Sequence, residues 1–565
     1  MIGVIAKADQ ARVVEEFFEL FKTPWEFCLP GRAYDVVIIT TKQVPEVNAK
    51  LLLLYGPDAT SQDGRWRIVD RNTGSAVLRV GDSTLPVYCG LSTFADKGQG
   101  PVCLTIDSQV AGFYAERNST TVLCLGYDLF EEVRFLLSTG QPVEHAQTPT
   151  LDRHIEMLRN WIVAEEIPLL EILSAPAGYR FSVCLTHDID FIGIRNHKFD
   201  HTMLGFVYRA TIGSLHNFFR RRLPLRQALK NWRAVASLPF VYFGWVKDFW
   251  EPFDWYLKAE KDLPSTYFLV PFKGKSGEKV PGQNGYTRAV AYEVGEHSEA
   301  LAMLRHAGSE IGVHGIDAWH SVDSGTNERN KISGVIGAPA TGIRMHWLLQ
   351  DRNTAVVLEK SGYVYDSTAG YNNTVGYWAG TSQVYRPLNA KELLELPVEI
   401  QDGALFYPQR LDLSTSGAEK LCRSLIGNAE KFGGVLTTIW HDRSHAPERL
   451  WGEFYTGLIQ TLRSMGVWFG TAGAIVGWFG QRRQAHFVQI QDSDGVRTAL
   501  RYEGPEIQPP LNVRCYSASI QVTVDDNPAV RFVDIPWNGK STPDLKTPLG
   551  LHSSSVQDPA LSSTL

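Results

Sequence analysis

The chain has 565 residues, which at roughly 100–200 residues per domain predicts several folding units and excludes a single small module. Hydrophobic residues make up 44% of the chain and charged residues 21%, a composition that excludes a largely disordered protein. The formal charge of −6 gives no chain-wide cationic field, so nucleic acid is excluded as a partner.

Residues 1–146 combine short β-rich runs with helical periods, which predicts a mixed α/β domain. The runs are MIGVIA, DVVIIT, KLLLLYG, LPVYCG and VCLTID, and the helical periods cover Ala11–Phe21 and Tyr127–Ser138. The N-terminal sequence has no basic leader before an apolar stretch, and no run reaches the roughly 20 apolar residues that span a bilayer. We therefore expect a cytoplasmic protein.

Residues 147–179 read as a linker followed by a helix over Leu151–Ala164. Residues 180–484 then alternate apolar runs with segments of helix length, which predicts a β/α barrel or an open parallel sheet. These runs are FSVCLT, STYFLV, EIGVH, ELPVEI, VLTTIW and VWFG. Residues 485–565 contain alternating runs such as HFVQIQ before a Ser- and Pro-rich end, which predicts a small β-rich appendage with a disordered tail.

Two aspartates follow the first of these strands, in FSVCLTHDIDF. Because the side-chain period of a strand is two, Asp188 and Asp190 should point to the same side while His187 points away. Two carboxylates that share a small volume favour a bound cation or a protonated partner, which suits a metal ligand beside a general base. A solvated pair that caps the next segment is the alternative.

Histidines follow a second strand, in EIGVHGIDAWHS. Imidazole and carboxylate groups are usual ligands of zinc and related divalent ions. His314 and His320 can converge on one ion only if the loop through Gly315 and Asp317 folds back. A capping or hydrogen-bonded core histidine is the alternative for His320.

Two further strand ends carry basic groups. In GIRMHW, Arg344 can hold a carboxylate such as Asp188 ionised, or make only a surface ion pair, and His346 suits a ligand or a buried hydrogen-bonding role equally. In GVLTTIWHDRSH, an apolar strand delivers Trp440 and His441, whose imidazole could protonate a leaving group. An acidic neighbour would keep that imidazole charged near neutral pH.

Together these motifs resemble the polysaccharide deacetylase (NodB-homology) superfamily, of the carbohydrate esterase type, over about residues 181–483. The resemblance implies a distorted seven-stranded β/α barrel, (β/α)7, and one divalent metal ion, Zn²⁺ or a related ion. It implies Asp188 as the general base, with Asp190, His314 and His320 as metal ligands. Five residues separate the two histidines, where the family usually has three.

The resemblance also covers the later motifs. It makes His441 the general acid and matches Arg344 to the arginine motif of the family, although His346 stands where that motif has a proline. The segment GYVYDSTAGYN resembles the stretch that follows the arginine motif, which implies a lining or bracing role for Asp366. We expect Trp440 and His346 to line or brace the site as well.

The implied function is hydrolysis of an N-acetyl group on an amino sugar of a polysaccharide or glycoconjugate, in surface polysaccharide biosynthesis. Two alternatives stay open: a metal-dependent C–N hydrolase that acts on a small cyclic amide, and a non-catalytic glycan-binding protein. A binding module needs no base and acid around a metal, so the full set of Asp188, Asp190, His314, Arg344 and His441 argues against the second alternative.

A long insert, at about residues 195–262, lies within the 124 residues that lead from Asp190 to His314. In it, aromatic and aliphatic residues interleave with basic ones: Arg209, Arg220, Arg221, Arg222, Arg226, Lys230 and Arg233. Such a segment suits peripheral contact with the inner face of a membrane, or helices that pack on the barrel or at a dimer contact. The sequence leaves this choice and the oligomeric state open.

Overall fold

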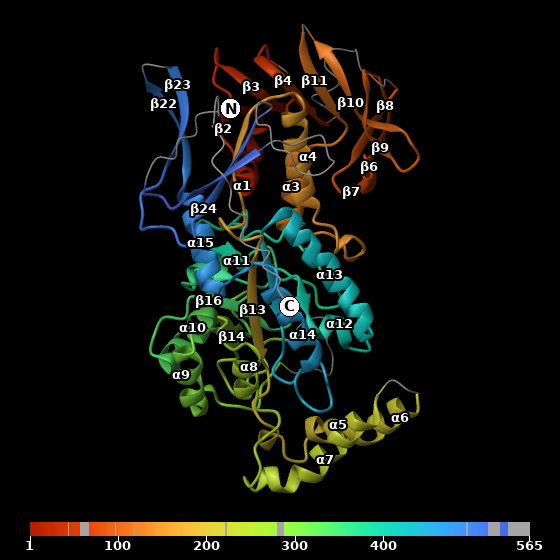
Figure 1. Ribbon diagram of the computed structural model, residues 1–565, viewed down its shortest axis with the longest axis vertical. Helices are drawn as coiled ribbons and strands as arrows, with labels where there is room; N and C mark the ends of the chain where they lie inside the picture. Colours follow the sequence, from red (N-terminus) through yellow and green to blue (C-terminus); the bar gives the residue numbers. More distant parts are fainter. Residues whose placement is uncertain are drawn as a thin grey trace, which may run out of the picture.

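The computed structural model describes residues 1–42, 45–56, 67–95, 98–117, 119–220, 223–279, 288–492, 495–517 and 532–540. Figure 1 shows an N-terminal sheet at one end, a parallel sheet in the middle and the helices of the insert at the other end. The predicted mixed α/β fold is confirmed. The division into four segments stays a prediction, and the tail beyond residue 540 lies outside the described residues.

The N-terminal sheet is half parallel and half antiparallel, in the order β2-β1-β3-β4-β11-β10-β9-β6-β7, with β5 and β8 joined to its antiparallel part. Helices α1 (Ala11–Phe21) and α3 (Leu129–Ser138) pack on it through a buried apolar cluster. The strands are β1 (Ile2–Ile5), β2 (Trp25–Phe27), β3 (Ala33–Ile39), β4 (Asn48–Tyr55), β5 (Ile68–Asn72), β6 (Ala76–Val80), β7 (Ser83–Val87), β8 (Leu91–Phe94), β9 (Gly100–Thr105), β10 (Val110–Arg117) and β11 (Thr120–Leu125).

The middle of the molecule is a nine-stranded sheet in which every paired strand is parallel, in the order β18-β17-β16-β15-β14-β13-β20-β19, with β21 also paired to β13. Within the described residues no ladder joins β18 to β19, so this is a curled half-barrel, and the seven-stranded barrel stays a prediction. The strands are β13 (Ser182–Ile189), β14 (Ser265–Leu269), β15 (Glu310–Gly315), β16 (Gly342–Met345), β17 (Tyr365–Asp366), β18 (Leu394–Glu395), β19 (Ile400–Gln401), β20 (Val435–Ile439) and β21 (Trp468–Phe469).

Helices cover the outer side of this sheet and bury one large apolar cluster against it. They are α8 (Phe253–Ala259), α9 (Ser298–His306), α10 (Val322–Ile336), α11 (Thr354–Lys360), α12 (Asp402–Phe406), α13 (Thr415–Phe432) and α14 (Gly452–Arg463). A second cluster fills the inner side, where α15 (Ala472–Gln484) packs against β13. The sheet is therefore buried on both sides, as its nearly continuous apolar strands require.

Strand β13 shows how the sequence builds a polar site on this apolar frame. Val183 and Leu185 belong to the outer cluster, whereas Cys184 belongs to the inner cluster beside α15. The next two residues of β13 that face the inner side are Thr186 and Asp188. The inner side thus changes from apolar at the start of the strand to polar at its carboxyl end.

The C-terminal residues pack back onto earlier parts of the chain. Strands β22 (His486–Asp492) and β23 (Gly495–Arg501) form a hairpin. Strands β24 (Leu511–Tyr516) and β25 (Phe532–Trp537) pair with β12 (Leu169–Ile172), which follows helix α4 (Thr150–Ala164). The guanidinium group of Arg482 joins α15 to this region, because it donates hydrogen bonds to four backbone carbonyls, those of Glu19, Leu20, Ile172 and Leu173.

The insert forms a two-layered helical projection beyond the carboxyl ends of the parallel strands (Figure 1). Its elements are α5 (His201–Tyr208), a π-helical turn over Arg209–Gly213, α6 (Ser214–Phe219) and α7 (Leu225–Tyr242). A small buried cluster that includes Phe206, Leu238 and Trp250 holds these helices together.

Candidate metal centre

Asp188 and Asp190 lie on the same side of the chain, as the strand period predicts. Nε2 of His314 is 3.8 Å from Oδ2 of Asp188 and 3.5 Å from Oδ1 of Asp190. The imidazole of His187 points to the opposite side, where it is fully buried and its Nε2 is 2.7 Å from Oε1 of Glu260. The alternation therefore separates a buried structural histidine from the two carboxylates of the site.

Arg344 holds Asp188 in place. It lies on β16, and its Nη1 donates a hydrogen bond of 2.9 Å to Oδ1 of Asp188. The guanidinium group also donates to the carbonyl and hydroxyl oxygens of Ser367 and lies 4.4 Å from the centre of the Phe268 ring on the intervening strand β14. Burial disfavours ionisation of Asp188, but the charge and hydrogen bond of Arg344, together with the charges of His314 and His441, outweigh it and lower the pKa of this carboxyl. Asp188 is therefore a buried carboxylate that stays ionised.

Asp190, His314 and His346 form the cluster that could hold a metal ion. One ligand atom from each lies within 4.8 Å of the others, and Nε2 of His346 is 3.4 Å from Oδ1 of Asp190. That oxygen is buried and has no hydrogen-bond partner within the described residues. Ligands at the usual zinc distances of roughly 2.0–2.1 Å lie about 3.3–3.4 Å apart in a tetrahedron, so the contacts of Asp190 fit such an ion.

The hydrogen bonds and charges around the cluster also bear on metal binding. Nδ1 of His314 is 2.9 Å from the carbonyl oxygen of Arg344; as the donor to it, this nitrogen leaves Nε2 free as a ligand atom. Burial lowers the pKa of His346 to about 4, which makes its imidazole neutral near pH 7. Burial opposes ionisation of Asp190, but the two neighbouring histidines hold its pKa well below the usual range. The donor set is thus one carboxylate and two imidazoles.

His320 is not part of this cluster, and His346 takes the position that the sequence analysis gave to it. The loop after His314 does not fold back: Asp317 is 2.8 Å from Nη2 of the buried Arg288, and Ser321 caps the start of α10. This path leaves Nε2 of His320 3.6 Å from the exposed Glu278. Spacing alone could not reveal this, because a contact with the distant Arg288 helps fix the loop.

His346 reaches Asp190 because β16 ends in a tight turn. The chain leaves the strand at Met345, and both Trp347 and Leu348 have positive φ angles, of 64° and 52°. Non-glycine residues adopt this left-handed region rarely and at a cost of order 1 kcal/mol or more. The turn keeps His346 beside His314, with ring centres 4.8 Å apart.

His441 follows β20 and forms a tight pair with Asp402. Nδ1 of His441 is 2.6 Å from Oδ1 of Asp402, and the backbone N–H of His441 donates to the other carboxylate oxygen. Burial would lower the pKa of the imidazole, but the charge and hydrogen bond of Asp402 raise it to about 10. Asp190 and Asp188 raise it further, so His441 lies within electrostatic reach of the cluster.

Asp402 was missed by the sequence analysis. A signal for it exists: it directly follows the apolar run LPVEIQ, so it stands at the carboxyl end of a strand like the other polar residues of the site. Asp442, the acidic neighbour of His441 in sequence, accepts a hydrogen bond of 3.1 Å from the backbone N–H of Asp190 instead. Burial raises the pKa of Asp442 to about 7.

Asp366 and Trp440 lie behind the site. Asp366 is buried on β17 and accepts a hydrogen bond from Thr368, whose hydroxyl oxygen accepts from the backbone N–H of Met345. It can therefore brace the turn that carries His346. Trp440 is fully buried, and its ring stacks on Tyr455 with centres 4.8 Å apart, so it faces the core and not the mouth of the site.

Comparison with solved structures finds chains described as a polysaccharide deacetylase, an allantoinase and a carbohydrate esterase, each over about half of this chain. A protein from Mycobacterium smegmatis described as a polysaccharide deacetylase aligns at 17% identity and a TM-score of 0.32 over 54% of this chain and 94% of its own. Puue allantoinase aligns at 14% identity and a TM-score of 0.33 over 54% and 91%. A family 4 carbohydrate esterase from Streptomyces lividans aligns at 11% identity and a TM-score of 0.23 over 53% and 94%. No protein-family model and no curated protein matches the chain.

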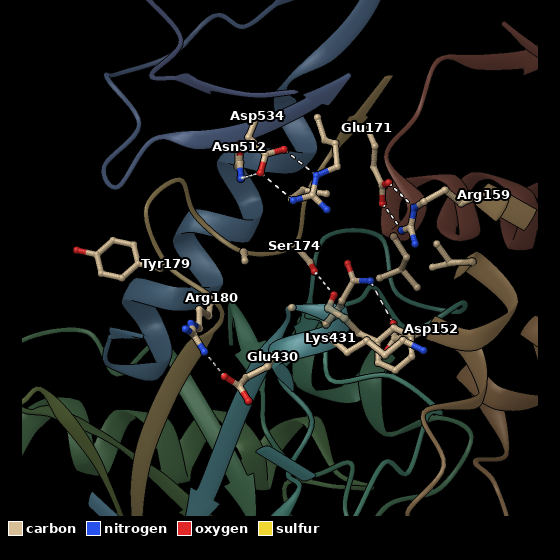
Figure 2. A pocket seen from close by; sticks show the side chains of 18 of the residues that line it. Asp152, Arg159, Glu171, Ser174, Tyr179, Arg180, Glu430, Lys431, Asn512 and Asp534 are labelled. Carbon is tan, nitrogen blue, oxygen red and sulfur yellow. Dashed lines mark hydrogen bonds and ion pairs between the residues drawn. The ribbon is translucent and has the colours of Figure 1, made fainter. Parts of the chain in front are cut away.

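A separate cavity of about 310 Å³ lies at the other end of the parallel strands, between α4, α13 and the sheet that contains β12 (Figure 2). Its charged side chains are all partnered: Arg159 pairs with Glu171, and Arg514 pairs with Asp534. Arg180 and Lys431 pair with glutamates, and Asp152 accepts hydrogen bonds from Thr381 and Gln383. Because these charged groups already have partners within the protein, we interpret the cavity as a polar contact between structural layers and not as a binding site.

Proposed function

We propose that this chain is a metal-dependent hydrolase that removes an N-acetyl group from an amino sugar of a polysaccharide or glycoconjugate precursor. One observation carries the proposal: an ionised, buried carboxylate and a charged imidazole flank the same cluster of possible metal ligands. Asp188 contributes the first and His441 the second. A base, a metal site and an acid together are what acyl–nitrogen hydrolysis requires.

Asp190, His314 and His346 would hold the metal ion. Nitrogen and carboxylate donors suit Zn²⁺ and other first-row divalent ions, with Zn²⁺ the usual choice for such a set. When bound, the ion lowers the pKa of water and polarises a carbonyl oxygen. The chemistry is the same as with the ligand set implied by the sequence motifs, because His346 offers an imidazole just as His320 would.

Asp188 is suited to accept a proton from the attacking water. Arg344 occupies its Oδ1, which leaves Oδ2 beside His314 as the free acceptor. Because the pKa of Asp188 is lowered, the group is ionised before the reaction begins. Arg344 acts through Asp188, as a positioning residue that fixes the orientation of the base.

His441 is suited to protonate the departing nitrogen. With Nδ1 bonded to Asp402, its Nε2–H is the proton left to give. Its raised pKa keeps this proton in place at neutral pH. Water loses one proton to Asp188 and the amine gains one from His441, which gives acetic acid and a free amino sugar. The acid then ionises to acetate, and return of the proton from Asp188 to His441 restores the starting state.

The residues of the site indicate the reaction, hydrolysis of an acyl–nitrogen bond. The N-acetyl amino sugar as substrate is proposed from the resemblance of the sequence motifs. The test is acetate release from chitooligosaccharide by the metal-loaded protein, with a cyclic ureide as the competing substrate. Asp188→Asn should abolish release and leave metal content near one ion per chain, whereas His320→Ala should be nearly as active as the wild type. Turnover of the ureide alone, or full activity of Asp188→Asn, would overturn the proposal.

A further inference from the structure

The insert concentrates exposed apolar side chains to a degree that the rest of the protein does not show. Twelve of the 21 large apolar side chains that are exposed among the described residues lie between Phe199 and Val246, a stretch of 48 residues. Single exposed apolar residues are ordinary, but a contiguous patch marks a surface that meets another apolar phase.

These residues form a stripe along one side of α5, the π-helical turn and α6. The spacings between successive members are four, four, three and four residues, so they lie on one helical face. Their side chains are between 43% and 74% exposed. The stripe consists of Leu204, Tyr208, Ile212, Leu215 and Phe219. A core-facing stripe would have the same spacing but would be buried, as Met203, Phe206 and Ala210 are on the inner side.

The insert as a whole also carries a strong positive charge. Residues 201–247 contain eight Lys and Arg residues and no Asp or Glu, whereas the rest of the chain has a formal charge of −14, because the total is −6. On α7, Arg226 and Lys230 directly follow the exposed Leu225 and Leu229, and Phe240 is exposed near the end of the helix. Within the described residues, Arg220, Arg226, Lys230 and Arg233 take part in no ion pair.

The inner side of the insert is fixed to the loop that follows His441. Ala446 of that loop belongs to the buried cluster of α5 and α7. The guanidinium group of Arg443 lies 4.0 Å from the centre of the Phe191 ring and 4.6 Å from that of Trp250. The helices are therefore mounted at the carboxyl ends of the parallel strands, the end at which the metal centre lies.

We propose that the stripe, Arg220 at the end of α6 and the basic residues of α7 form a docking face for an anionic lipid bilayer. Amphipathic helices with apolar and aromatic residues on one side and basic residues beside them bind in the plane of a bilayer interface. Each basic residue near an anionic leaflet then adds to the attraction. No described helix has the length and apolarity of a membrane span, so the contact is peripheral.

The charge argues for a bilayer over a second copy of this chain. Two such faces brought together would bring the positive charges of Arg220, Arg226, Lys230 and Arg233 towards the same four charges of the second copy, and like charges in contact oppose association. An anionic bilayer accepts both the apolar stripe and the charge. Docking would hold the mouth of the metal centre next to the lipid surface; that consequence rests on the proposed function, whereas docking itself does not.

The test is flotation of the full-length protein with phosphatidylcholine vesicles, prepared with and without phosphatidylglycerol. The wild type should float with the anionic vesicles and much less with the neutral ones. Ile212→Glu with Phe219→Glu should abolish binding, because charged groups replace the centre and the end of the stripe. Replacement of Arg226, Lys230 and Arg233 by Gln should weaken binding about a hundredfold, at about fivefold for each charge.

Controls separate docking from misfolding and from the proposed function. Val69→Glu with Ile106→Glu changes two equally exposed apolar residues of the N-terminal sheet and should leave flotation unchanged. Asp188→Asn should float like the wild type, because binding needs no turnover. Absence of binding to anionic vesicles, or equal binding by the stripe variant, would overturn the proposal. A wild-type dimer that only the stripe variant dissociates, without vesicle binding, would assign the face to a second copy.

Discussion

Replacement of Asp402 by Asn tests the charge that the structure assigns to His441. The substitution keeps the size of the side chain and an oxygen that can accept the Nδ1–H, but it removes the negative charge 2.6 Å from the imidazole. In the wild type, Asp402 raises the pKa of His441 against the effect of burial to about 10, from an ordinary value of 6.5. Asp190 and Asp188 also raise this pKa, but Asp402 contributes most, so without its charge burial should bring the pKa down to near 6.5.

The size of the effect depends on pH. At pH 8, a histidine with a pKa of 6.5 is only about 3% protonated, so kcat of Asp402→Asn should be about thirtyfold below that of the wild type. At pH 6 most of the acid is protonated, and the two proteins should differ little. The assay is kcat for acetate release from chitooligosaccharide across this range. The alkaline limb should move from about 10 to near 6.5.

Ser444→Ala is the matched control, because the Ser444 hydroxyl donates to the same carboxylate without contributing charge. It should leave the alkaline limb in place.

The raised pKa of His441 also predicts how the free energy of unfolding depends on pH. Since folding raises this pKa, the pairing with Asp402 is fully stabilising below pH 6.5, and its contribution is lost as the pH rises towards 10. An equal loss of kcat at every pH in Asp402→Asn would refute the assignment.

Three further predictions concern the metal centre and its support. Loss of a residue that only hydrogen-bonds a metal ligand typically lowers metal affinity roughly ten- to hundredfold. His346→Ala should lower the affinity for Zn²⁺ by more than this, because it removes a ligand itself, whereas His320→Ala should leave the affinity unchanged. Metal content after dialysis measures both. Arg344→Leu should lower the free energy of unfolding by about 3–5 kcal/mol in urea titrations, because it leaves the Asp188 carboxylate buried and unpaired; an unchanged midpoint would contradict this. EDTA should abolish hydrolysis while far-UV circular dichroism stays unchanged, and Zn²⁺ should restore it; activity that survives chelation would exclude a required metal.

Much of the site could be predicted from the sequence because it follows from local rules. The strand period places Asp188 and Asp190 on one side, and the carboxyl ends of parallel strands bring these residues near His314 and Arg344. His441 follows the same rule on β20. These rules use only residues close in sequence and the order of apolar runs.

The rest depends on contacts between distant segments. The choice between His320 and His346 is decided by how Arg288 holds the loop and by the turn at Trp347, which no spacing reveals. Asp402 follows a strand of only two residues, β19, so the strand that positions it gave a weak signal in the sequence. Strand β17, with two residues, had no apolar run of its own, and the single run ELPVEI leads from β18 to β19, which contain two residues each.

The central claim is that Asp190, His314 and His346 hold one divalent ion next to Asp188. Anomalous diffraction from crystals grown with Zn²⁺ tests it directly, because the signal locates the ion without reference to activity. The expected result is one strong peak between the three ligand atoms. A peak beside His320 with none at Asp190, or no bound ion at saturating metal, would contradict the account.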